Sequence, residues 1–295
     1  MHPWELSALL HQALESRVER ILQLTAREGW LDDVGAVHDV RVASRRLRTA
    51  LSFVASEAYP GLPRQRKRAK AITVALGATR ELDVHVLGLA SLGTELPDQA
   101  GHAVLEHVLE VFERRRSQAR RRMVRGIDRA GIPELRGLIG TPRAQIDPGG
   151  DPALAVRDLL APKLRETLGG AGERISVEDA PALHRLRISV KKLRYAVEVL
   201  AGALPPESVT WLARLKEVQG ALGEHHDWTT LEAELWETHA ELTNHRRAAL
   251  AAGTLDLLGI VVERRRAAFE ALQAAAQPLD LDRALEALLP GGSPA

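Results

Sequence analysis

The chain has 295 residues, a formal net charge of +1 and no cysteine, so it can bury a sizeable core but forms no disulfide and no cysteine-ligated metal site. Aromatic residues make up only 3% of the chain, and alanine and leucine dominate its apolar share, a composition that favours helix over strand. The sequence does not begin with a basic and apolar leader, and no apolar run approaches the ~20 residues of a membrane span, so we expect a soluble cytoplasmic protein.

The spacing of apolar positions between Gly, Pro and Asp breaks predicts an all-α fold. In chain order, the expected helices span residues 4–28, 36–57, 62–90, 98–128, 152–169, 179–203, 206–238 and 241–275, and a short amphipathic piece follows at 281–289. A turn-forming stretch with little apolar content, residues 140–152, separates the fourth helix from the fifth. The chain therefore divides into halves 1–147 and 148–295, each predicted to be an antiparallel four-helix bundle.

The second half repeats the pattern of the first at a constant offset. Residues 37–48 align with residues 183–194, so that His184 follows His38 by 146 positions, and the same offset pairs Lys70 with Lys216. Toward the end of each half, Glu113-Arg114-Arg115-Arg116 resembles Glu263-Arg264-Arg265-Arg266 at an offset of 150. This regularity predicts an internal duplication, with the two bundles related by pseudo-twofold symmetry. The matched glycines Gly77 and Gly223 indicate close backbone packing at both positions.

One helix in each half carries a basic stripe. At 3.6 residues per turn, the stripe residues share one face of their helix and span ten residues, roughly 15 Å. They are His38, Arg41, Arg45 and Arg48 in the first half and His184, Arg187, Lys191 and Arg194 in the second. Cations at this spacing repel one another, so a stripe without acidic partners is suited to an anionic ligand. The alternative is a solvated face whose cations pair with acids of a neighbouring helix.

Two further arginines, Arg115 and Arg265, fall within the apolar arc of the last helix of each half. A buried guanidinium without a partner is costly. The expected partner is either a carboxylate, such as Glu81 or Asp227, or a bound anion that extends the site inward between the helices. The alternative is that these side chains reach out to solvent at the end of the bundle.

The doubled segment His-x-x-Arg-x-x-x-(Arg/Lys)-(Arg/Lys)-Leu-Arg, followed in each half by Leu-Gly-x-x-(Arg/His)-(Asp/Glu), resembles the CHAD family, the conserved histidine α-helical domain. Arg80-Glu81-Leu82-Asp83 is similar to the family's Arg-Asp-Leu-Asp, and residues 215–223 are similar to its second-half counterpart. Thr229, at the repeat position of Asp83, departs from this pattern and is assigned no role. The resemblance implies two four-helix bundles with a basic central groove that binds inorganic polyphosphate, at polyphosphate granules in some members.

The resemblance also implies which residues of this chain contact the polyanion. They are His38, Arg41, Arg45, Arg48, His184, Arg187, Lys191, Arg194 and Lys216. Arg80 and Lys70 are added to this set, and Arg115 and Arg265 are added as an inward extension. The chemistry agrees, because a flexible phosphate chain has no base edges to read. It is recognised by Arg forks, Lys charges and counterion release. We expect no catalytic residue, no metal and no cofactor.

Two other functions fit part of the pattern. His38-Asp39 and His225-His226-Asp227 are compatible with a metal-dependent phosphohydrolase, but such enzymes need several ligands converging on one metal, and no spaced set of carboxylates accompanies them. The Glu-x-Glu-x-Lys signature of the triphosphate-tunnel enzymes is missing its Lys at residues 232–236. Sequence-tolerant binding of single-stranded nucleic acid normally uses stacking aromatics, and only Tyr195 lies among the stripes. Nonspecific binding of duplexes at low salt remains an alternative.

Overall fold

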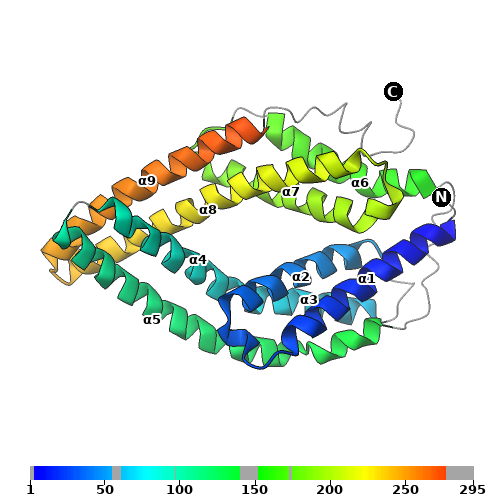
Figure 1. The fold of residues 1–295 in the computed structure, drawn as a ribbon, viewed down its shortest axis with the longest axis horizontal. Helices are drawn as coiled ribbons and strands as arrows, with labels where there is room; N and C mark the ends of the chain where they lie inside the picture. Colours follow the sequence, from blue (N-terminus) through cyan, green and yellow to red (C-terminus); the bar gives the residue numbers. More distant parts are fainter. Residues whose placement is uncertain (1–2, 55–60, 97, 140–151, 173–174, 277–295) are drawn as a thin grey trace.

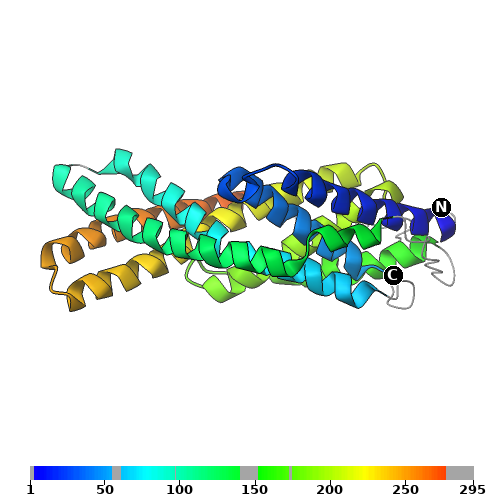
Figure 2. The same ribbon diagram turned by 90° about the horizontal axis from the view of Figure 1, so that it is seen from below.

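The computed structural model describes residues 3–54, 61–96, 98–139, 152–172 and 175–276, and within these ranges all regular structure is helical (Figures 1 and 2). The helices are α1 (Pro3–Thr25), α2 (Val34–Ser52), α3 (Leu62–Ala75), α4 (Gly77–Leu92), α5 (Gln99–Ala130), α6 (Pro152–Gly172), α7 (Ala180–Leu200), α8 (Ser208–Asn244) and α9 (Ala248–Ala276), with short 3-10 turns between some of them. The predicted all-α fold is confirmed. The proposed boundary near residue 148 and the amphipathic piece at 281–289 lie outside the described residues.

Aspartate side chains set where three of the helices begin. The carboxylate of Asp33 accepts a hydrogen bond from the Gly35 N–H at 2.8 Å at the start of α2. Asp98 and Asp179 cap α5 and α7 in the same way. Each such cap is worth about 1 kcal/mol. At the other end of α5, Gly131 takes a left-handed conformation with φ 68°, which stops the helix. The starts of the two stripe-bearing helices are thus fixed by local sequence.

The prediction of one continuous helix over 62–90 is wrong. The chain bends at Leu76, whose backbone takes φ −80° and ψ −6° between α3 and α4. The Leu76 side chain is fully buried and fixes the bend in the core, so α3 stays within one end of the molecule while α4 extends away from it. The corresponding stretch of the second half continues without a break in α8.

The expectation of close packing at the matched glycines is also wrong. A methyl group placed on Gly77 or on Gly223 would meet no atom within 4 Å beyond its own helix surroundings. The close approaches lie elsewhere: a Cβ at Gly126 of α5 would come within 2.9 Å of the Ala75 Cβ. Gly77 marks a bend rather than a helix contact.

Two hydrophobic cores occupy the two ends of an elongated molecule (Figure 1). The larger core joins α1, α2, α3 and the end of α5 to α6, α7 and the first part of α8. In the smaller core, the antiparallel pairs α4–α5 and α8–α9 converge around Phe112. Both cores contain residues of both halves, so the two halves fold against each other. None of the helices in the described ranges combines the length and apolar character that a bilayer span requires.

Candidate anion-binding site

The two basic stripes meet between the cores, where α2 packs against α4 and α7, and α4 packs against α8. Arg41 of α2 and Arg187 of α7 are both partly buried there. Burial, and then the charges of Arg45, Arg187 and Arg80, lower the pKa of Arg41 to about 10. Since these neighbours come from α2, α4 and α7, stripe residues far apart in the sequence share one site.

Lys191 of α7 is surrounded by the other cations of this site. Burial, and then the charges of Arg45, Arg187, Arg41 and Arg48, lower its pKa to about 7. A lysine shifted this far is short of compensating negative charge. We call the group that interacts in this way the central cluster: His38, Arg41, Arg45, Arg80, Arg187 and Lys191.

Several buried nitrogens of the central cluster have no hydrogen-bond partner in the described part of the chain. His38 Nδ1, Arg41 Nε and Arg187 Nε are buried and make no hydrogen bond to any described residue. Burial, followed by the charge of Arg80, lowers the pKa of His38, so this histidine is neutral at neutral pH. An unmet buried donor costs about 1–3 kcal/mol, and a bound anion would recover it at Arg41 and Arg187.

Acidic groups also border the cluster: Asp227 of α8 and Glu81 of α4 act on Arg187, and Asp39 of α2 acts on His38. Burial raises the pKa of Asp227, against the opposing charges of Arg187 and Arg80. Beside it, burial and then Arg187 lower the pKa of His226 to about 4, and the His226 ring centroid lies 5.2 Å from that of His184. In the described part of the chain, no three His, Asp or Glu side chains are arranged to hold a metal ion. The geometry therefore gives no support to a metallohydrolase site at residues 225–227.

Arg194 is placed apart from the other stripe residues. It is buried, its Nε donates to Gln219 Oε1 at 2.7 Å, and its guanidinium pairs with Glu198. Its guanidinium carbon also lies 4.5 Å from the centroid of the Tyr195 ring. Because these partners occupy its donors and its charge, Arg194 is not open to an external anion.

The expectation that Arg115 has a carboxylate partner is met, but by different residues. Its guanidinium binds Glu234 at 2.8 Å and Glu241 at 3.2 Å, both on α8, whereas Glu81 or Asp227 was expected. This pair ties α5 of the first half to α8 of the second. It fixes the smaller core and leaves no charge on Arg115 for a ligand.

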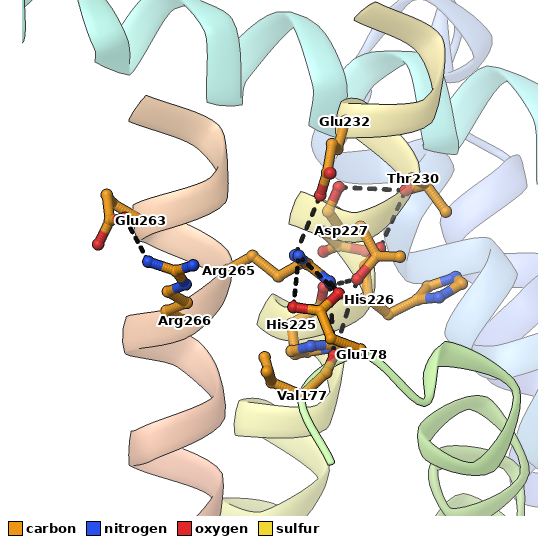
Figure 3. A network of polar contacts seen from close by, with 11 residues as sticks. Val177, Glu178, His225, His226, Asp227, Thr230, Glu232, Glu263, Arg265 and Arg266 are labelled. Atoms are coloured by element: carbon orange, nitrogen blue, oxygen red, sulfur yellow. Dashed lines mark hydrogen bonds and ion pairs between the residues drawn. The ribbon is translucent and has the colours of Figure 1, made fainter. Parts of the chain in front are cut away.

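Arg265 is neutralised in a similar way (Figure 3). It extends from α9 between Glu232 of α8, at 3.0 Å, and Glu178 in the segment before α7, at 3.1 Å. Its Nη1 also donates to the carbonyl oxygen of Val177. Both guanidinium groups serve as links between helices, so the structure gives no support to the predicted inward extension of the site through Arg115 and Arg265.

The remaining predicted residues lie outside the central cluster. Arg48 and Lys70 are exposed and line a hollow of about 420 Å³ between α2 and α3, together with Ser52. His184 is exposed at the start of α7 and lines another hollow. Lys216 is exposed on α8 and, within the described ranges, forms no ion pair. Of these four residues, Arg48 lies nearest to the central cluster in effect, since its charge helps to lower the pKa of Lys191.

A hollow of about 430 Å³ adjoins the cluster and includes residues that the sequence pattern missed. Lys163 of α6 and Lys192 of α7 add two cations, and the Tyr195 side chain accepts a hydrogen bond from Arg45. We call this space the α6 hollow; its lining is Arg45, Arg48, Thr49, Ser52, Thr73, Lys163, Ile188, Lys191, Lys192 and Tyr195. Lys163 stands 146 positions after Arg17, so the repeat offset is the one sequence signal that leads to it.

Comparison with known proteins agrees with this arrangement. The model of the CHAD domain family matches residues 12–236. Among solved structures, the chain is similar to the CHAD domain from the plant Ricinus communis, with a TM-score of 0.62 and 25% identity over 98% of this chain and 93% of that one. It also shares its fold with PptA from Streptomyces chartreusis, with a TM-score of 0.62 and 18% identity over 92% of this chain and 99% of that one. No curated protein matches. Because the family model spans most of its length, the chain belongs to the CHAD domain family.

Proposed function

We propose that this protein binds inorganic polyphosphate in the central cluster without hydrolysing it, and that it does so at polyphosphate granules. The observation that carries the proposal is uncompensated charge: the charged residues acting most strongly on Arg41 and Lys191 are other cations. The association of the CHAD family with polyphosphate supports the same interpretation. The cores at both ends hold the cations together against their repulsion, and a polyanion would relieve it.

The chemistry of the cluster suits a phosphate chain. Arg41, Arg45 and Arg187 offer fork-shaped donors that bind phosphate oxygens in pairs, and Lys191 adds a point charge. Polyphosphate repeats its negative charge at short intervals, so successive units reach successive cations. Binding should release counterions and weaken steeply as salt rises.

The alternatives find less support. Base stacking, which single-stranded nucleic acid uses, needs an exposed aromatic ring beside the cations. Tyr195 is the aromatic residue in the lining of the α6 hollow, and it is only 4% exposed, with Arg194 over its ring. The phosphohydrolase hypothesis has no group of metal ligands in the described ranges.

We also propose that residues 1–147 and 148–295 arose by duplication and are related by pseudo-twofold symmetry. The support is that Arg41 and Arg187, and likewise Arg45 and Lys191, are 146 positions apart and interact at the contact of α2 with α7. Residues next to a symmetry axis meet their own counterparts in this way.

A competition titration tests the proposed function. Labelled long-chain polyphosphate is bound at physiological salt and displaced by unlabelled polyphosphate, by tripolyphosphate or by duplex DNA. We expect long-chain polyphosphate to compete best, since it fills the most cation positions. Equal competition by duplex DNA would contradict specific polyphosphate binding. Release of orthophosphate that depends on a divalent metal would instead establish the phosphohydrolase.

The lowered pKa of Lys191 leads to a pH prediction. Above about pH 7 this lysine is largely neutral in the free protein, and bound polyphosphate raises its pKa, so binding takes up a proton. Affinity should therefore fall as pH rises through about 7 and beyond. Calorimetry at about pH 8.5, above the histidine range, in buffers of different ionisation enthalpy measures this uptake. Lys191→Arg, which stays charged, should abolish it; an unchanged uptake in that variant would show that another group titrates.

A further inference from the structure

One carboxylate distinguishes the two sides of the contact between α2 and α7. On one side, Glu198 of α7 binds Arg46 of α2 at 3.0 Å and Arg194 of α7. Glu198 is also the charge that most strongly supports the protonated form of Arg17 on α1. Three arginines from three helices are thus arranged around one partly buried carboxylate. That side is closed by internal ion pairs.

On the other side, the repeat counterparts of these three arginines lack a counterpart of Glu198. The residues 146 positions from Arg17, Arg46 and Arg194 are Lys163, Lys192 and Arg48. The position that matches Glu198 is Ser52.

The cations on the Ser52 side have few internal partners. Lys192 pairs with the exposed Glu166 at 2.9 Å. Among the described residues, neither Arg48 nor Lys163 forms an ion pair, although Lys163 Nζ donates to the Leu159 carbonyl oxygen at 3.2 Å and lies 5.0 Å from the centroid of the Phe53 ring. Thr73, which matches the Gln219 that binds Arg194, already donates to the Ala69 carbonyl oxygen. The charges of Arg48 and Lys163 are therefore free to bind an external anion.

The open side coincides with the α6 hollow. Lys163, Arg48 and Ser52 all line it, and Arg45 and Lys191 join it to the central cluster. Arg48 and Ser52 also line the neighbouring hollow that ends at Lys70. Together the two hollows form a cationic path from the central cluster between α2, α6 and α7 to α3.

We propose that polyphosphate leaves the central cluster on one side only, through the α6 hollow, where Lys163 and Arg48 bind its phosphates. This inference rests on the proposed function. A phosphate chain directed toward Glu198 would meet arginines already bound to that carboxylate, and the carboxylate itself would repel it. On the Ser52 side the carboxylate is Glu166, which is exposed and pairs with Lys192, so among the described residues Arg48 and Lys163 keep their charges free of ion pairs. Chains long enough to reach Lys163 and Lys70 gain contacts that a short chain cannot make.

Ser52→Glu tests the proposal, because it installs on the open side the carboxylate that closes the other. Ser52 is exposed, so the protein should fold normally, and the introduced carboxylate would pair with Arg48 and Lys163. We expect long-chain polyphosphate to bind about tenfold more weakly or worse, as the loss of one charge-assisted contact or more implies. Ser117→Glu, at an exposed position of α5, makes the same change of charge away from the path and should alter the affinity less than about twofold.

A second pair of variants removes the cations instead. Arg48→Gln with Lys163→Gln should lower the slope of log K against log salt by roughly 0.7 per lost charge, and Arg121→Gln with Arg125→Gln, on the exposed face of α5, should leave it unchanged. If the wild-type protein binds polyphosphate but these path variants match their controls, the one-sided path is wrong and the proposed function stands. If the wild-type protein does not bind polyphosphate, both fall.

Discussion

Replacing Arg41 and Arg187 together with alanine is expected to weaken the binding of long-chain polyphosphate by about a hundredfold or more. Each guanidinium presents a buried Nε that has no acceptor among residues the structure describes, and each adds to the positive charge around Lys191. A charge-assisted hydrogen bond is worth about 1.5–3 kcal/mol, and every 1.4 kcal/mol is tenfold in affinity, so two lost contacts account for this factor. A binding isotherm at physiological salt measures it.

The matched control is Arg121→Ala with Arg125→Ala, which removes the same charge from the exposed face of α5. Its effect should stay within a few-fold, because exposed charges act over little more than ~8 Å at physiological salt. Loss of Arg41 relieves repulsion, whereas loss of Arg187 removes the cation that faces Asp227, so circular dichroism of the double variant must show that it is folded. A double variant that bound as tightly as the control would locate the polyphosphate site away from the α2–α7 contact.

Much of the fold could be predicted from the sequence, because helix composition and capping are local properties. Asp33 and Asp179 mark the starts of α2 and α7, and both expected helices were placed within a few residues. The bend at Leu76 could not be predicted in this way. The same Ala-Leu-Gly letters occur at residues 221–223 inside the continuous helix α8, so the difference arises from tertiary packing.

The sequence predicts which basic residues of the site share a helix face. It does not predict which of them form ion pairs with carboxylates of other helices. Periodicity identifies Arg41 and Arg187 as residues on one face, and it identifies Arg194 equally well. It places Glu198 one turn beyond Arg194 on the same face, but it does not reveal that this carboxylate also binds Arg46 of α2, or that Glu234 and Glu241 face Arg115 across a helix contact. These glutamates decide which basic residues are free to bind an anion. The positions of the glutamates relative to the arginines follow from the packing of the helices.

The second half also departs from the first at Thr229, which was given no role. In the first half the buried Asp83 binds Arg116 at 2.8 Å, whereas Arg266, the counterpart of Arg116, lies on the surface with Glu263. Loss of the buried acid at position 229 thus accompanies an arginine turned outward. As with Ser52 and Glu198, a single acid present in only one half decides whether nearby arginines are internal links or open charges.

Glu198→Ala is expected to destabilise the protein by about 3 kcal/mol or more. The change leaves Arg194, which is 6% exposed, and the partly buried Arg46 and Arg17 without their shared carboxylate. Removing one partner of a buried ion pair typically costs about 3–5 kcal/mol, because the remaining charge stays desolvated. Urea unfolding followed by circular dichroism measures the loss. Glu166→Ala, which breaks the exposed pair with Lys192, should cost less than about 1 kcal/mol and serves as the control.

Polyphosphate should restore part of the stability that Glu198→Ala loses. Without the Glu198 carboxylate, Arg46 and Arg194 resemble their counterparts Lys192 and Arg48, which have Ser52 at the matching position. A bound polyanion can then take the place of the carboxylate. A ligand that binds only the folded state stabilises it by mass action, so polyphosphate should raise the Tm of the variant by more than that of the wild type. Equal shifts in Tm would mean that the Glu198 side stays closed even without its carboxylate, and the asymmetry of the site would then have another cause.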